Sequence, residues 1–225
     1  MRPKDLEPQF SVYSPIHNKL VDGDACNLDV DLVQKMPLQT LANFRVKTSS
    51  VNNQEKTYAL QLGRYSLPYY KQVLRLISAD GKYRMEALEH LPQILIPFLE
   101  QQQLPFAHQI TPFTKVLSFN LITKVDGHHH PALRAKKFVP WAFHCLDGEK
   151  NFQYLLVDFE LGSDTYAKFI QDLKSNGGNE IDAMKQAHSH PLYTALGFEL
   201  VPQVTISATG IKPAVFALYK RLKYV

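Results

Sequence analysis

The sequence predicts a mixed α/β protein in which helices flank a mostly antiparallel central sheet. Three observations support this fold class. From residue 115 onward, apolar and polar residues alternate with the period of two that is typical of half-buried strands. Other stretches repeat apolar residues at helical spacing. Asp-Gly pairs at 126–127 and 147–148 lie between apolar runs, as in hairpin connections.

The composition indicates a folded chain. With 225 residues, 45% of them apolar, and no low-complexity tract, the chain can bury a substantial core. Residues 1–57 contain four prolines and an Asp-Gly-Asp turn signal, but no clear period. We therefore expect an irregular N-terminal arm over 1–57, with one short helix near 31–36, and an α/β domain over 58–225.

Cysteine usage and charge limit the class of protein. Cys26 and Cys145 are the only cysteines, too few for a disulfide scaffold, which is typical of a reducing compartment. The first residues lack the apolar segment of a signal peptide, and no stretch has the about 20 apolar residues of a membrane span. We therefore expect a soluble cytoplasmic protein. The net charge of +4 is spread out and does not favour nucleic-acid binding.

The elements expected between residues 57 and 115 are one strand and three helices. The strand is predicted at 57–62. Ser66 is suited to cap a helix, and the apolar residues that follow it keep helical spacing, so a helix is predicted over 66–79. A second helical pattern covers 84–102, but two prolines remove backbone donors within it. We expect two short helices there.

The elements expected after residue 115 begin with three strands, at 115–121, 137–145 and 152–160. A helix follows from Asp164, because apolar residues recur at helical spacing until an Asn-Gly-Gly turn at 176–178. The remaining elements are a short strand at 180–184, a helix that carries Leu192 and Tyr193, and two closing strands at 203–207 and 214–221.

The helix that carries Leu192 and Tyr193 ends in Leu196-Gly197-Phe198 and leads into the closing strands. Gly197 follows the last apolar residue of the helix, where a left-handed backbone suits glycine. This ending resembles the C-terminal signature of the Gcn5-related N-acetyltransferases, and the order of the predicted elements resembles that family's fold. The resemblance implies an acyl-CoA N-acyltransferase-like fold that moves an acetyl or longer acyl group from coenzyme A to an amine acceptor.

The resemblance also implies where acetyl-CoA or another acyl-CoA, the donor substrate, would bind. The strand at 152–160 would offer backbone groups to the pantetheine, those of Leu156 and Val157 among them. The turn after this strand would offer the amide groups of Gly162 and Ser163 to the pyrophosphate, at the positive end of the following helix.

Amine acylation needs a base for the amine and an acid for the departing thiolate. Asp158 and Glu160 are two residues apart on one face of a strand, where either could act as the base directly or through water. The resemblance implies that Tyr193 protonates the thiolate. We expect these groups to surround one cleft, formed where their strand diverges in a V from the strand at 180–184.

A different class of function remains open. The turn after 152–160 has a single glycine, and the Asp164 carboxylate would compete with a phosphate for the same amide donors. The chain could therefore be a non-catalytic binding or interaction protein, including one associated with nucleic acid. His128, His129 and His130 match no established zinc spacing, so no metal site is predicted.

Overall fold

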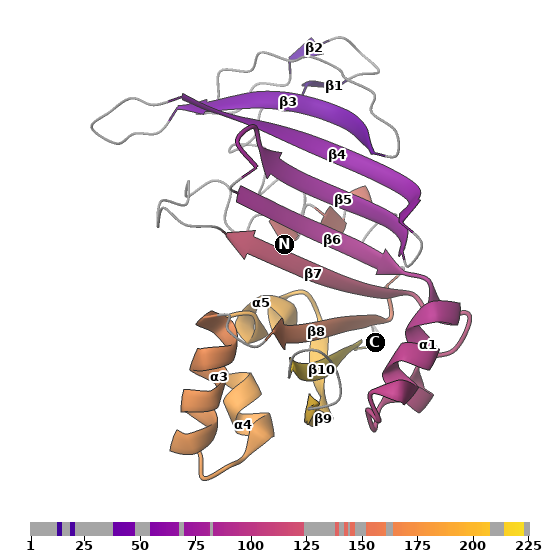
Figure 1. The fold of residues 1–225 in the computed structure, drawn as a ribbon, viewed down its shortest axis with the longest axis vertical. Helices are drawn as coiled ribbons and strands as arrows, with labels where there is room; N and C mark the ends of the chain where they lie inside the picture. The colour runs from indigo at the N-terminus through magenta and orange to yellow at the C-terminus, as the bar shows by residue number, and fades with distance from the viewer. Residues whose placement is uncertain are drawn as a thin grey trace. The chain divides into compact units, whose positions relative to one another are not determined.

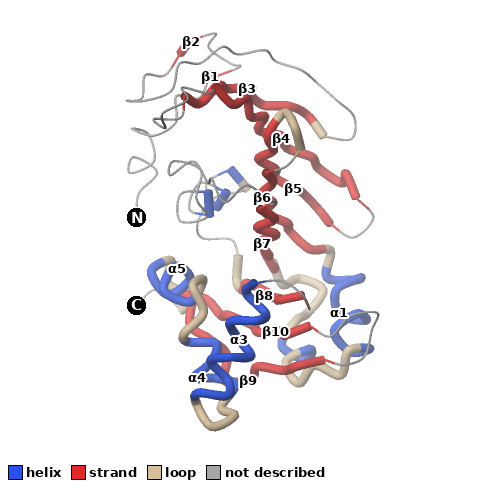
Figure 2. The backbone as a smooth tube through the Cα atoms, turned by 60° about the vertical axis from the view of Figure 1, so that its left-hand side comes forward, coloured by secondary structure: helices blue, strands red, loops and turns tan. Residues whose placement is uncertain are grey.

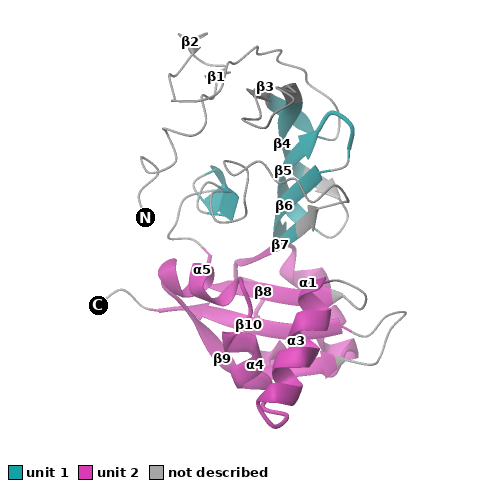
Figure 3. Cartoon of the chain, turned by 90° about the vertical axis from the view of Figure 1, so that its left-hand side faces the viewer, with its two compact units in different colours: residues 1–89, 119–149 teal, residues 90–118, 150–225 magenta. Residues whose placement is uncertain are grey.

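The computed structural model (Figure 1) describes residues 13–14, 19–20, 38–47, 55–67, 70–81, 83–123, 138–139, 142–143, 145–146, 152–160, 164–207 and 214–222. The chain divides into two compact units (Figure 3), unit 1 from Met1–Glu89 and Phe119–Glu149, and unit 2 from His90–Ser118 and Lys150–Val225. The boundary expected after residue 57 does not coincide with this division.

Unit 1 is built mainly from strands. They are β1 (Tyr13–Ser14), β2 (Lys19–Leu20), β3 (Gln39–Lys47), β4 (Glu55–Leu67), β5 (Tyr70–Ser78), β6 (Tyr83–His90, its last residue in unit 2) and the end of β7 (Val116–Thr123). β4 pairs antiparallel with β3 on one side and with β5 on the other. The strand expected at 57–62 is confirmed within β4. β3 is an additional strand inside the expected arm, and the helix expected near 31–36 lies outside the described residues.

The helix expected over 66–79 is wrong, because this segment contains the end of β4 and then β5. Val73, Leu74 and Leu76 are all fully buried, although consecutive residues of a strand face opposite sides. A strand buried on both faces reads as an almost continuous apolar run, which fits a helical spacing as well as a strand. The antiparallel register with β4 distinguishes the two possibilities.

Only one of the two short helices expected over 84–102 exists. The first half of this range is β6, whose Met85, Ala87 and Leu88 are buried on both faces, as in β5. The second half is α1 (Pro92–Gln101), which is confirmed. Pro92 lies in its first turn, where a helix needs no N–H donor.

The strand expected over 137–145 is wrong, because the described residues of this range are helical. The buried members of this helical segment are Phe138, Val139, Ala142, Phe143 and Leu146. Their spacing of one and three residues is that of one helix face. The ring of Phe143 meets that of Phe119 on β7, with 5.9 Å between the centroids.

Unit 2 contains the start of β7 and most of the helices. Its other elements are α1, the 3₁₀ turn η3 (Ala107–Gln109), β8 (Tyr154–Glu160), α3 (Asp164–Ser175), α4 (Glu180–Lys185), α5 (His190–Ala195), β9 (Phe198–Ser207) and β10 (Ala214–Arg221). The strands predicted at 115–121, 152–160, 203–207 and 214–221 and the helix from Asp164 are confirmed.

The hydrogen-bonded strands follow the order β3-β4-β5-β6-β7-β8-β10-β9. β8 is antiparallel to β10, β10 is antiparallel to β9, and β7 is parallel to β8. The predicted class, a mixed α/β protein with a mostly antiparallel sheet, is therefore confirmed.

Helices cover both faces of the strands in unit 2 (Figure 2). On one face, which we call the α1 face, Leu99 of α1 shares a core with Leu156 of β8 and Phe216 of β10. On the opposite face, the α3–α5 face, Phe159 of β8 meets Phe169 of α3 with 6.2 Å between ring centroids. Because side chains alternate along a strand, the even-numbered residues of β8 belong to the α1 face and the odd-numbered residues to the α3–α5 face.

The short strand expected at 180–184 is wrong, because this segment is helix α4. The side chain of Asn179 caps the helix by accepting a hydrogen bond of 3.1 Å from the backbone N–H of Asp182. Glu180 and Asp182 also place negative charge in the first turn, which favours a helix. The V expected between this segment and 152–160 therefore does not exist, and the strand neighbours of β8 are β7 and β10.

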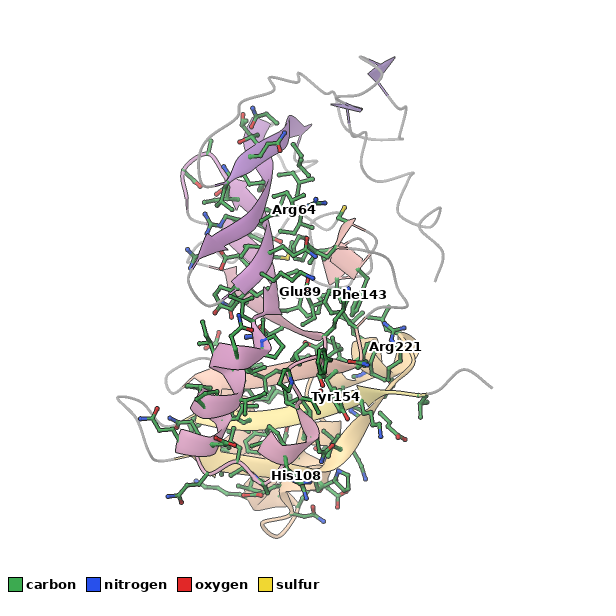
Figure 4. The ribbon with its side chains drawn as sticks, turned by 90° about the vertical axis from the view of Figure 1, so that its right-hand side faces the viewer. Arg64, Glu89, His108, Phe143, Tyr154 and Arg221 are labelled. Atoms are coloured by element: carbon green, nitrogen blue, oxygen red, sulfur yellow. The ribbon has the colours of Figure 1, made fainter. Side chains whose placement is uncertain are left out.

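The end of unit 2 agrees with the local signals of the sequence. Gly197 has a φ of +82° directly after α5, as expected for a glycine that ends a helix. β9 then begins at Phe198, five residues earlier than expected. Arg221 (Figure 4) lies with its guanidinium 4.5 Å from the centroid of the Phe198 ring and donates a 2.8 Å hydrogen bond to the carbonyl of Phe152.

Candidate functional site

β8 lies between two other strands. β10 pairs antiparallel with β8 from Tyr154 to Glu160, the whole strand. β7 is parallel to β8, with Val116–Ser118 in register with Tyr154–Leu156. We call the side of residues 157–160 that points away from β10 the β8 edge.

The two residues expected to contact the donor through their backbones lie where this edge begins. Leu156 lies opposite Ser118 of β7, and Val157 is the next residue along the strand. Both side chains are buried, Leu156 in the core with α1. Their side chains therefore serve packing, and only backbone groups are suited to contact a ligand there.

Asp158 belongs to the α1 face and is partly exposed. It lies opposite Phe216 in the register with β10, and Phe216 packs against Phe98 of α1 with 6.1 Å between ring centroids. Asp158 thus lies on the α1 face at the β8 edge.

Tyr193 lies on the α3–α5 face, where its ring meets that of Tyr219 edge to face with 5.1 Å between centroids. The side chain is only 4% exposed. Burial raises the pKa of Tyr193, the negative charge of Asp158 raises it further, and the nearby Ser189 side chain acts in the opposite direction. The phenol therefore stays protonated at neutral pH, as a proton donor requires.

Tyr219 connects Tyr193 to a histidine. Its hydroxyl lies 2.9 Å from Nδ1 of His190, the first residue of α5. Burial raises the pKa of Tyr219, with Tyr193 adding to the effect. Desolvation, and after it the charge of Lys185, lowers the pKa of His190. The contact is thus a neutral imidazole beside a neutral phenol at physiological pH.

The structure does not bring the predicted acid and base onto one face of the sheet. Asp158 belongs to the α1 face and Tyr193 to the α3–α5 face, so the two residues flank β8 from opposite sides. They remain within electrostatic range, since the charge of Asp158 contributes to the raised pKa of Tyr193.

Several other predicted residues lie at or beyond the limits of the described structure. Glu160 is the last residue of β8, and its side chain is not among those described. Gly162, Ser163 and His128, His129 and His130 lie outside the described residues. Within the described part of the chain, no group of three or more histidine, cysteine or acidic side chains could hold a metal ion.

A histidine and a serine that sequence reasoning did not single out form a pair in unit 2. Nε2 of His90, at the end of β6, lies 2.8 Å from the hydroxyl oxygen of Ser118 on β7. Ser118 is 4% exposed and lies opposite Leu156 in the parallel register, at the start of the β8 edge. Desolvation lowers the pKa of His90 to about 4, so the ring is neutral at physiological pH. No local signal could have joined two residues on different strands.

Unit 1 holds a separate set of buried charges. Glu86 is 6% exposed and accepts a 2.6 Å hydrogen bond from Nε of Arg75 on the neighbouring strand. Glu89 (Figure 4) is 2% exposed, accepts a 2.6 Å bond from the amide of Gln72 and lies 3.4 Å from the ammonium of Lys71. Both carboxylates are matched by donors, as buried charges in a folded core require.

Comparisons with known proteins identify no relative, since no family model, no curated protein and no solved structure matches this chain. Among the residues that the structure describes, no helix combines the length and the apolar character needed to cross a bilayer. The chemistry of the site therefore has to be argued from its own residues.

Proposed function

We propose that the protein is an acyltransferase that moves an acetyl or longer acyl group from coenzyme A to an amine acceptor. The observation that carries this proposal is the position of Asp158 and Tyr193 at β8, with the carboxylate close enough to raise the pKa of the phenol. A carboxylate and a protonated phenol are the base and the acid that amine acylation requires. In the proposal, the extended pantetheine of coenzyme A binds along the β8 edge.

The side groups around the β8 edge suit the proton transfers of amine acylation. In the proposed reaction Asp158, partly exposed on the α1 face, accepts the proton that the amine loses on attack. Tyr193, whose phenol is protonated at neutral pH, donates a proton to the departing thiolate. The two groups approach the edge from opposite faces of the sheet, so donor and acceptor would enter from different sides.

Binding of the donor is the first test of the proposal. Isothermal titration with acetyl-CoA and with longer acyl-CoAs should detect binding of at least one of them. Failure of every acyl-CoA to bind would refute the enzymatic proposal and would favour a non-catalytic binding protein.

Turnover is the second test, and it measures the contribution of the Asp158 carboxylate. Thiol release from the bound acyl-CoA should be measured with a panel of amines, including polyamines and lysine peptides. Asp158→Asn keeps the size of the side chain and removes the base, so release should fall while donor affinity is unchanged. Glu199→Gln, at an exposed carboxylate on β9, is the matched control and should behave as the unaltered protein.

A further inference from the structure

The His90–Ser118 pair has the arrangement of a nucleophile and its base. The hydroxyl oxygen of Ser118 lies 2.8 Å from Nε2 of His90, within the range over which a base takes a proton from a nucleophile. The two residues lie on adjacent strands, β6 and β7, which fixes the positions of their backbones. Sites on strands are held more precisely than sites on loops.

The surroundings of the pair set its protonation state and its contact with water. Desolvation keeps the imidazole of His90 neutral at physiological pH, the state from which a base acts. Ser118 is 4% exposed, and its hydroxyl would therefore react in a site from which most water is excluded. His90 keeps partial exposure, so the pair is not closed off on every side.

We propose that Ser118 is a nucleophile, activated by His90, that accepts an acyl group from an activated ester or a thioester. The Ser118 oxygen forms a bond to the acyl carbon while its proton passes to Nε2 of His90. The bond between the acyl carbon and the leaving oxygen or sulfur then breaks, and the leaving group takes the proton from His90. The products are an acyl-serine and the free alcohol or thiol.

This inference deepens the proposed function and rests on it only for the identity of the donor. Ser118 lies opposite Leu156, where the β8 edge begins, so an acyl-CoA bound along that edge would bring its thioester toward the serine. In this route His90 returns a proton to the thiolate. When the amine attacks the thioester directly, as in the proposed function, Tyr193 has this role. An acyl-serine would then pass its acyl group to the amine.

The test uses p-nitrophenyl acetate, which carries a small activated acyl group and no coenzyme A. The full-length protein should release a burst of p-nitrophenolate, and mass spectrometry of its peptides should locate one acetyl group on Ser118. Ser118→Ala should abolish the adduct. His90→Asn, which can still hydrogen bond but cannot act as the base, should slow acetylation by about 100-fold.

Ser78 provides the matched control. It is also a buried strand serine, 5% exposed, but its hydroxyl donates a hydrogen bond to the Asp80 carboxylate and accepts one of 3.0 Å from the N–H of Tyr83. Its hydrogen-bond partners among the described residues do not include a histidine. Ser78 should remain unmodified, and Ser78→Ala should acetylate at the rate of the unaltered protein.

Two results would overturn the inference. One is the absence of acetyl on Ser118 of the unaltered protein, a measurement that stands even if a variant fails to fold. The other is acetylation of a folded His90→Asn protein at the unaltered rate, which would show that His90 does not activate the serine. Because the probe lacks coenzyme A, acetylation of Ser118 and binding of acyl-CoA succeed or fail independently.

Discussion

The neutral imidazole of His90 makes the stability of the protein depend on pH. Its pKa falls from an ordinary 6.5 to about 4 in the folded protein because burial disfavours the charged ring. Between these values the unfolded chain binds a proton that the folded chain does not, so the free energy of unfolding decreases as the pH falls. The stabilisation from the neutral ring is complete above pH 6.5 and is lost as the pH falls toward 4.

The size of this pH dependence follows from the difference between the pKa values of His90 in the unfolded and the folded chain. Relative to pH 7.5, the free energy of unfolding should be lower by about 2 kcal/mol at pH 5 and by about 3 kcal/mol at pH 4 from His90 alone. Other groups titrate over the same range. His90→Asn removes only the imidazole, so the difference between the unaltered protein and this variant isolates the contribution of His90.

Urea denaturation of both proteins at pH 7.5, 5 and 4, followed by circular dichroism, measures this difference. It should change by about 2 kcal/mol from pH 7.5 to pH 5, in the direction that makes the unaltered protein relatively less stable in acid. A difference that stays constant within about 0.5 kcal/mol across this range would refute the argument, because it would mean that His90 titrates alike in the folded and unfolded chains.

Three further substitutions test other parts of the structure. Tyr193→Phe should lower thiol release from acyl-CoA by about 10²–10⁴-fold with little change in donor affinity, since only the proton donor is removed. Gly197→Ala should lower the free energy of unfolding by about 1–2 kcal/mol in urea denaturation, because alanine is strained at a φ of +82°. A clash with neighbouring residues does not contribute, since no neighbouring atom lies within 4 Å of an added Cβ. Arg75→Met should lower the free energy of unfolding by about 1–3 kcal/mol, because it removes the 2.6 Å donor of the buried Glu86 carboxylate and leaves only Arg84 at 3.8 Å.

Each of these predictions has its own control. A folded Tyr193→Phe protein with undiminished turnover would show that the phenol is a core group only. The control for Gly197→Ala is Phe113→Ser, at a side chain that is 92% exposed, which should leave the free energy of unfolding unchanged. Replacing Arg75 and Glu86 together by apolar residues should recover most of the loss. An equally unstable double variant would show that the loss does not come from the weakened pairing of the buried carboxylate.

The elements that the sequence predicted well carry their signals locally. α3 begins at Asp164 and ends before an Asn-Gly-Gly turn, and α5 ends at a glycine with positive φ. β10 runs over Ala214–Arg221, the range that was expected. Caps, turn glycines and the alternation of a strand act within a few residues, so they can be read without knowledge of distant partners.

The residues of the candidate site also differ in whether the sequence alone could indicate them. Tyr193 and Asp158 could be proposed from their positions in a short helix and an alternating strand, but the sequence could not tell that they flank β8 from opposite faces. His90 and Ser118 are 28 residues apart and meet only because their strands lie side by side. In the sequence, Ser118 is one polar residue of an alternating run.

The sequence by itself determined the mixed α/β class, the boundaries of α3, the end of α5 and the closing strands. Only the tertiary structure decided that β5 and β6 are strands, that the segment around Phe143 is helical, and that β7 lies parallel beside β8. The physical reason is that burial on both faces hides the period of a strand. Pairing and burial depend on partners far along the chain, and a local pattern of apolar residues does not specify them.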